Sequence, residues 1–190
     1  DSWSGVGMAC GGNVEMVVEL IEPNPRLILL GAGHVAKMIA QTAIFAGYAV
    51  IVVDPYAKNE DFPMADRVLV ESYGEGLPKV DIRQKDAIVV LTRHHSDTPA
   101  LESALKTKAE YVGMIGSKNR VSMVYKELMR KGFSKKKLLQ VHAPIGLDIE
   151  AETPEEVAIS IVSEMIMVKR GGTGGVMALN KIDDSSKGKT

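Results

Sequence analysis

A glycine-rich turn between two regular segments constrains the fold of this chain more than any other feature. The turn reads Gly31-Ala32-Gly33-His34-Val35-Ala36, and it follows an all-apolar run over 27–30. After the turn, apolar residues recur at helical spacing over 35–46. This order predicts a buried strand, a tight turn and then a helix.

The same alternation continues along most of the chain. Four more short apolar runs predict strands at 49–53, 68–70, 87–91 and 111–115. Helices are expected at 99–107, at 119–131 and after Thr153, which has Pro154 next to it and Glu156 at the third position of a capping box. Strands that are apolar on both faces and separated by helices indicate a parallel sheet covered on both sides. The predicted fold class is α/β, with a doubly wound, mainly parallel, Rossmann-like sheet.

Composition divides the chain into three parts. Residues 1–24 form an N-terminal segment with strand periodicity over 14–21, so the fold is expected to carry a short β-containing extension. The sequence Pro23-Asn24-Pro25 disfavours regular structure and marks the boundary. Residues 25–170 then form the nucleotide-binding domain, and the glycine-rich and polar stretch 171–190 is predicted to be a flexible tail.

Charge and cysteine content narrow the expected partners and compartment. The formal net charge is −1, which provides no global field toward nucleic acid or an anionic membrane. The longest apolar stretches fall short of the ~20 residues that span a bilayer. The single cysteine, Cys10, cannot form an intrachain disulfide, and no basic and apolar leader opens the sequence. We therefore expect a cytoplasmic protein.

The glycine turn meets the contextual tests for a dinucleotide-binding fingerprint. Gly31 permits the tight turn, Gly33 lets a phosphate approach the backbone, and Ala36 lets the helix pack closely on the sheet. The free amides at the helix start, from His34 and Val35 onward, would receive the phosphate. Asp54, 21 residues beyond Gly33, would accept hydrogen bonds from the ribose and repel a 2′-phosphate, which favours NAD over NADP. The alternative is a turn that needs glycine for geometry alone.

Two other loops are expected at the same carboxyl edge of the sheet, where ligands bind in doubly wound folds. Thr92 opens the first loop, in which Arg93 and His95 suit a phosphate or a polar substrate, unless the loop is merely solvated. Zinc binding by His94 and His95 is disfavoured because no CxxC or HxxxH accompanies them, so no metal site is predicted. The second loop is another anion-receptive turn or an ordinary capped helix start, with the residues Gly116, Ser117, Lys118 and Arg120.

His34 and Cys10 each permit two interpretations. A protonated His34 beside a phosphate would be favourable, but the same residue at a helix start also caps the helix or faces solvent. Cys10 precedes Gly11 and Gly12 in an open context that allows reactivity, although a lone cysteine is more often inert. Catalysis by Cys10 is therefore not assigned from the residues alone.

Several strings together resemble the XdhC/CoxI family of xanthine dehydrogenase accessory proteins. They are Met8-Ala9-Cys10-Gly11-Gly12, the glycine turn at 31–36, 111–117, 142–149 and Thr153-Pro154-Glu155-Glu156. The resemblance covers most of the chain, from about Met8 to Arg170. The chain departs from the family pattern at Arg93, where histidine is usual, and at Glu150, where glycine is usual.

The resemblance implies a maturation role rather than catalysis on a metabolite. Such proteins are similar to chaperones that hold the molybdenum cofactor, assist its sulfuration and pass it to a molybdenum hydroxylase apoenzyme. It implies contact between that cofactor, molybdopterin or its dinucleotide form, and Cys10, Gly11 and Gly12. A cysteine desulfurase is a further implied partner.

Two readings of function therefore remain open at the level of sequence, besides a nucleotide-sensing module without chemistry of its own. The first is the maturation factor, with NAD or another dinucleotide in the glycine turn. The second is an NAD-dependent oxidoreductase with His95 or the loop that begins at His142 as acid and base. A homodimer fits either reading, since a short N-terminal strand needs a sheet partner.

Overall fold

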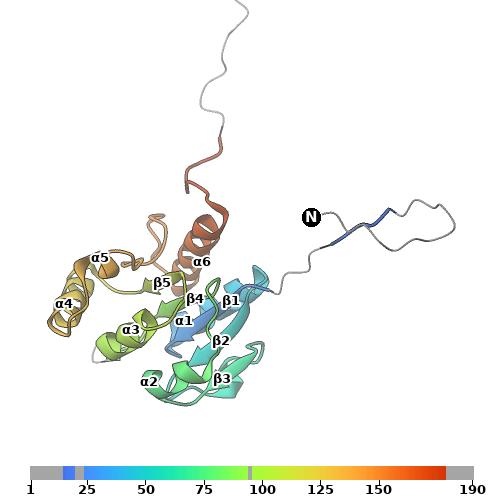
Figure 1. Ribbon diagram of the computed structural model, residues 1–190. Helices are drawn as coiled ribbons and strands as arrows, with labels where there is room; N and C mark the ends of the chain where they lie inside the picture. The colour runs from blue at the N-terminus through green and yellow to red at the C-terminus, as the bar shows by residue number, and fades with distance from the viewer. Residues whose placement is uncertain (1–14, 20–23, 94–95, 179–190) are drawn as a thin grey trace, which may run out of the picture.

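Five short apolar segments form one parallel sheet. The computed structural model describes residues 15–19, 24–93 and 96–178. Over these residues the strand order is β3-β2-β1-β4-β5, and every neighbouring pair is parallel (Figure 1). The strands are β1 (Arg26–Leu30), β2 (Ala49–Val53), β3 (Arg67–Leu69), β4 (Ala87–Val90) and β5 (Tyr111–Met114). The predicted parallel, doubly wound sheet is confirmed.

Helices cover both faces of this sheet. The long helices are α1 (His34–Phe45), α3 (Asp97–Leu105), α4 (Lys118–Arg130) and α6 (Pro154–Arg170). Single turns lie between them at η1 (Asn59–Asp61), α2 (Tyr73–Gly76), η2 (Leu77–Lys79) and α5 (Lys135–Leu138). The expected helices are therefore present, with α3 beginning two residues earlier than its apolar pattern indicated.

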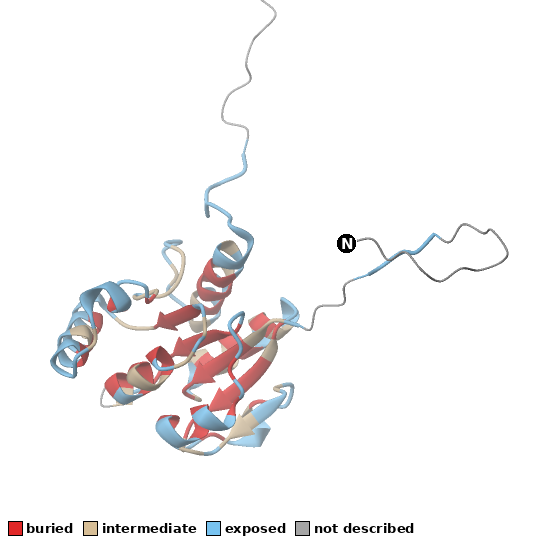
Figure 2. Ribbon diagram, in the orientation of Figure 1, coloured by how far each residue is buried: buried red, intermediate tan, exposed pale blue. Residues whose placement is uncertain are grey.

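Alternate side chains of each strand enter two separate cores. Leu27 and Leu29 of β1 pack with α1 and α6, whereas Ile28 and Leu30 pack with α3 and α4. All four are fully buried, and full burial of each such side chain stabilises the fold by roughly 1.5–3 kcal/mol. Figure 2 shows this buried sheet between helices whose outer surfaces are exposed. The two cores fix the strand ends and the loops that follow them.

The start of α6 confirms the predicted capping box. The Thr153 hydroxyl accepts a hydrogen bond from the Glu156 amide at 3.2 Å, and the Glu156 carboxylate accepts one from the Thr153 amide at 3.0 Å. The Thr153 and Glu152 amides that bond the Glu156 carboxylate lower its pKa. Both contacts satisfy amides that have no partner inside the helix.

The N-terminal strand is a correction. Over the described residues 15–19 the chain is exposed and has no strand structure, so the alternation of apolar and polar residues over 14–21 does not produce a strand there. Residues 14, 20 and 21 lie outside the described residues. Alternation alone gave the wrong answer because a strand also requires a neighbour to accept its hydrogen bonds. Within the described ranges, no helix is long and apolar enough to cross a membrane.

Candidate functional site

The loops that leave β1, β2, β4 and β5 meet at one edge of the sheet. The strand order reverses direction between β1 and β4, and ligands in open α/β sheets bind at the carboxyl ends of the strands at such a point. Gly31 is the first residue after β1, and its φ of 131° is one that glycine alone adopts readily. A Cβ built there would lie 2.5 Å from the Leu91 carbonyl oxygen. Glycine at 31 is therefore required by backbone geometry.

Asp54 lies beside this loop and bonds to it. Its carboxylate accepts hydrogen bonds from the Tyr56 amide at 2.7 Å, from the Tyr73 hydroxyl at 2.9 Å and from the Ala32 amide at 3.3 Å. Burial, together with the hydrogen bond to Asp54, raises the pKa of Tyr73. Asp54, the residue predicted to bind the ribose, thus also holds the glycine loop in place through the Ala32 amide. The sequence contains no signal for Tyr73, because nothing in its local pattern links it to Asp54.

Gly33 leaves the start of α1 open. It is the N-cap residue, with φ −74° and ψ −176°, and no side chain in the described structure caps the helix. A Cβ at this position would meet no atom within 4 Å, and the first turn of α1 contains no acidic residue. His34 beside it is also exposed. The amides at this helix start are therefore accessible to an anion, which the partial positive charge of the helix end attracts.

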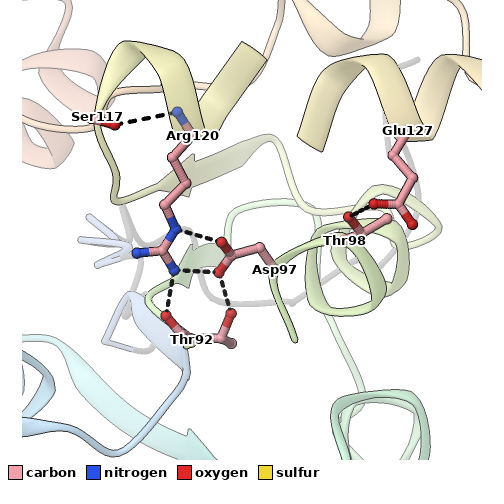
Figure 3. A network of polar contacts seen from close by, with 6 residues as sticks. All are labelled: Thr92, Asp97, Thr98, Ser117, Arg120 and Glu127. Carbon is pink, nitrogen blue, oxygen red and sulfur yellow. Dashed lines mark hydrogen bonds and ion pairs between the residues drawn. The ribbon is translucent and has the colours of Figure 1, made fainter. Parts of the chain in front are cut away.

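The second predicted anion turn, between β5 and α4, differs because side chains fill it (Figure 3). Arg120 donates to both carboxylate oxygens of Asp97, at 2.5 and 2.6 Å, and to the Thr92 carbonyl at 2.6 Å. The Thr92 hydroxyl donates to the same carboxylate at 2.6 Å. Asp97 is 1% exposed and Arg120 18%, so this is a largely buried ion pair. The positive charge of Arg120 is offset within the protein.

Ser117 completes the closure of that turn. Its hydroxyl accepts a hydrogen bond from the Arg120 amide at 3.2 Å and so caps α4, while Gly116 precedes it in the loop. Of the predicted anion ligands in this turn, Lys118 remains exposed, as does Arg93 in the neighbouring loop. The structure thus brings Thr92, Gly116 and Ser117 to the expected edge of the sheet.

His142 belongs to a separate cluster on the outer side of β5. Its backbone bridges Gly113, and its ring stacks on Tyr111 with centroids 4.5 Å apart. Nδ1 of His142 lies 2.6 Å from the Glu164 carboxylate, which also accepts the Gly146 amide. Burial acts to raise the pKa of Glu164, but these hydrogen bonds outweigh it and leave the pKa below its ordinary value.

No local sequence pattern links His142 to its partner Glu164. Glu164 stands in an apolar stretch of α6 and is 22 residues away along the chain, so only the fold reveals the pair. A glutamate that interrupts an otherwise apolar helix face is nevertheless a signal that a buried polar partner exists. The cluster lies beside the edge strand β5, which β4 separates from β1 and its glycine loop.

Cys10, Gly11 and Gly12 lie outside the described residues, as do His94 and His95. Among the residues that are described, no group of three or more histidine, cysteine, aspartate or glutamate side chains is arranged to hold a metal ion.

Comparison with known proteins supports the assignment of this domain. Residues 27–165 match the family model described as the XdhC Rossmann domain. A protein of Bacillus subtilis (strain 168), named as a probable xanthine dehydrogenase subunit, is 35% identical over 159 residues, which are 82% of this chain and 46% of that protein. The molybdenum cofactor insertion chaperone PaoD of Escherichia coli (strain K12) is 24% identical over 149 residues, 77% of this chain and 41% of the chaperone.

A solved structure shares the same fold. The crystal structure of a xanthine dehydrogenase from Bacillus halodurans superposes with a TM-score of 0.69 and 31% identity, over 78% of this chain and 45% of that one. The chain spans between about a third and half of the length of the curated relatives it matches. The similarity therefore concerns one domain of these longer proteins.

Proposed function

We propose a function on one premise: this chain belongs to the XdhC family. The proposed function is that of a cytoplasmic accessory factor for a molybdenum hydroxylase of the xanthine dehydrogenase or carbon monoxide dehydrogenase type. The factor binds a dinucleotide or the molybdenum cofactor, assists sulfuration of the cofactor and delivers it to the apoenzyme. Two relatives, named as a cofactor insertion chaperone and a probable xanthine dehydrogenase subunit, support this proposal.

The observation that carries the binding proposal is the uncapped glycine at the start of α1. Serine, threonine, aspartate or asparagine at an N-cap stabilises a helix, and glycine does so less well. Gly33 has ordinary backbone angles and open space where a Cβ would lie, so neither strain nor crowding requires glycine there. The space that a capping side chain would fill is instead available for an external phosphate group.

The described residues fit the diphosphate of a dinucleotide. The amides of Gly33, His34 and Val35 would hold it, because the loop presents a helix start without an acidic side chain. Asp54 already accepts three hydrogen bonds, and a carboxylate has about four acceptor positions, so one remains for a ribose hydroxyl. When bound, the molybdenum cofactor would supply the redox-active metal that the recipient enzyme needs.

Contacts to the pterin and the sulfur chemistry rest on the family resemblance. The resemblance implies that Cys10, Gly11 and Gly12 contact the cofactor, and that a cysteine desulfurase delivers the sulfur. The recipient apoenzyme is the second proposed partner, and a homodimer is the proposed assembly. Thr92, Gly116 and Ser117 would line the same edge as the dinucleotide, since their loops follow β4 and β5.

Identification of the bound molecule tests the proposal. The chain is purified from a molybdenum-replete host, and native mass spectrometry identifies what it carries. The maturation factor predicts a pterin or an adenine- or cytosine-containing nucleotide, with no nicotinamide turnover on small alcohols or acids. Recovery of flavin or S-adenosylmethionine would refute the ligand assignment.

The His142–Glu164 pair is the observation that favours an alternative, an NAD-dependent oxidoreductase. A carboxylate bonded to Nδ1 orients an imidazole for proton transfer. This pair lies beside the edge strand β5, whereas the glycine loop follows β1 on the other side of β4, which disfavours hydride transfer between them. Steady NADH production without any bound pterin would establish the oxidoreductase instead.

A further inference from the structure

The positive charge of this protein is concentrated on one pair of helices. Residues 118–138, which include α4 and α5, hold eight of the 23 lysines and arginines and one of the 24 acidic residues. This segment therefore carries a net charge of +7, and the rest of the chain carries −8. The net charge of the whole chain is near zero, but the charges are unevenly distributed between this segment and the rest. Such an uneven distribution of charge steers and selects charged partners.

Most of these cations have no ion-pair partner within the described structure. Arg120 pairs with Asp97, and Lys131 pairs with Glu102. For the other six, no ion pair with a described residue is found; they are Lys118, Lys126, Arg130, Lys135, Lys136 and Lys137. Their charge is therefore available to an external partner.

An apolar groove lies between these helices. It has a volume of about 460 Å³, with Val121, Tyr125, Met129 and Leu138 among its lining residues and Lys118, Lys126 and Lys135 also bordering it. On α4 the lining residues recur three or four positions apart, so they form one stripe along the helix. Leu139, at the end of α5, lines the same groove and is 68% exposed.

We propose that this groove, termed the α4–α5 groove, binds an acidic amphipathic helix of a partner protein. The apolar stripe matches the apolar face of a helix laid in a groove, and the bordering lysines match acidic residues on its flanks. A nucleic acid binds through its phosphates and would leave the apolar lining of the groove without a partner. A membrane surface does not fit into a concave site. Figure 1 shows α4 and α5 together at the end of the molecule beyond β5, and Figure 2 shows that their outer surfaces are exposed.

The test uses a synthetic helical peptide of about 18 residues, or five turns, with a leucine stripe flanked by glutamates. Binding to the full chain is measured by fluorescence anisotropy. The probe is expected to bind saturably, and Leu139→Asp and the double variant Lys126→Glu, Lys135→Glu should each weaken binding about tenfold or more, or about 1.4 kcal/mol. All three sites are exposed, so circular dichroism should show an unchanged fold.

Lys108→Glu is the matched control, because Lys108 is an exposed lysine beside a different cavity of about 580 Å³. It should leave peptide affinity within about twofold, which is within the scatter of a few tenths of a kcal/mol. A peptide with lysine in place of glutamate should not bind. The proposal is overturned if the acidic peptide fails to bind, if Leu139→Asp has no effect, or if duplex DNA or phosphatidylserine vesicles bind more tightly than the peptide. None of these variants alters the glycine turn after β1, so a failure of the groove proposal is distinguishable from a failure of the proposed nucleotide site.

Discussion

The turns after β1 and β5 have the same order of strand, glycine and helix, but they differ in how the start of the helix is capped. In each, a parallel strand passes through glycine into a helix at the same edge of the sheet. After β5, Ser117 caps the helix and the nearby cation is paired with a buried carboxylate. After β1, the N-cap is Gly33 and no side chain caps the helix. From this difference we infer that the turn after β5 is structural and that the turn after β1 is open for a ligand.

The substitution with the largest expected effect breaks the closed turn after β5. Asp97→Ala leaves the mostly buried guanidinium of Arg120 without its carboxylate, and loss of one member of such a pair costs about 3–5 kcal/mol. Urea denaturation should report that loss in the free energy of unfolding. The matched control is Glu60→Ala, which removes an exposed pair with Lys58 and should change stability by less than about 1 kcal/mol. An unchanged stability in Asp97→Ala would show that the turn is not held by this pair.

A negative charge in the open turn should abolish most ligand binding. Gly33→Asp fits the backbone angles and its Cβ meets no neighbouring atom, so the fold is expected to persist. The carboxylate would compete with the phosphate for the same amides, and affinity for NAD or ADP should fall roughly a hundredfold, about 2.7 kcal/mol. Isothermal titration calorimetry measures the change. Equal affinity in the variant would place the nucleotide elsewhere.

Removal of the cap in the closed turn should affect stability alone. Ser117→Ala deletes the acceptor for the Arg120 amide, and loss of an N-cap costs about 1 kcal/mol. Nucleotide affinity should remain within about twofold of the original protein. Ser122→Ala, at an exposed position inside α4, is the control and should be neutral or slightly stabilising. A loss of affinity in Ser117→Ala would instead make this turn part of the ligand site.

The substitution with the smallest expected effect converts the open turn after β1 into a capped one. Gly33→Ser supplies the missing cap to α1 and should stabilise the free protein by a few tenths of a kcal/mol, visible in the thermal midpoint. The same substitution should reduce the stabilisation that added nucleotide provides. A destabilised Gly33→Ser protein would mean that glycine is needed there for folding, against the proposed role.

Sequence periodicity predicted the sheet and its long helices because local patterns decide these features. The apolar runs at β1, β2, β4 and β5 are buried on both faces, and only a covered parallel sheet satisfies such runs. Periodicity failed over residues 15–19, which have no strand structure and pair with no strand of the described ranges. Strand pairing depends on distant residues, which a local pattern does not contain.

The candidate site was predictable only in part for the same reason. Gly31, Gly33 and Asp54 carry a local fingerprint, and the structure places all three at one edge. The contact between Asp54 and Tyr73, and the pair of Asp97 with Arg120, join residues 19 and 23 positions apart. These contacts decide which turn is open, and they follow from tertiary packing alone.

Amide-resolved NMR during titration with NAD or ADP shows which of the two turns receives the nucleotide. We expect large, saturable shifts of the backbone amides of Gly33, His34 and Val35, while those of Lys118 to Arg120 stay nearly unchanged. Shifts centred on the turn after β5, or no saturable shift at the turn after β1, would contradict the assignment of the open turn as the nucleotide site.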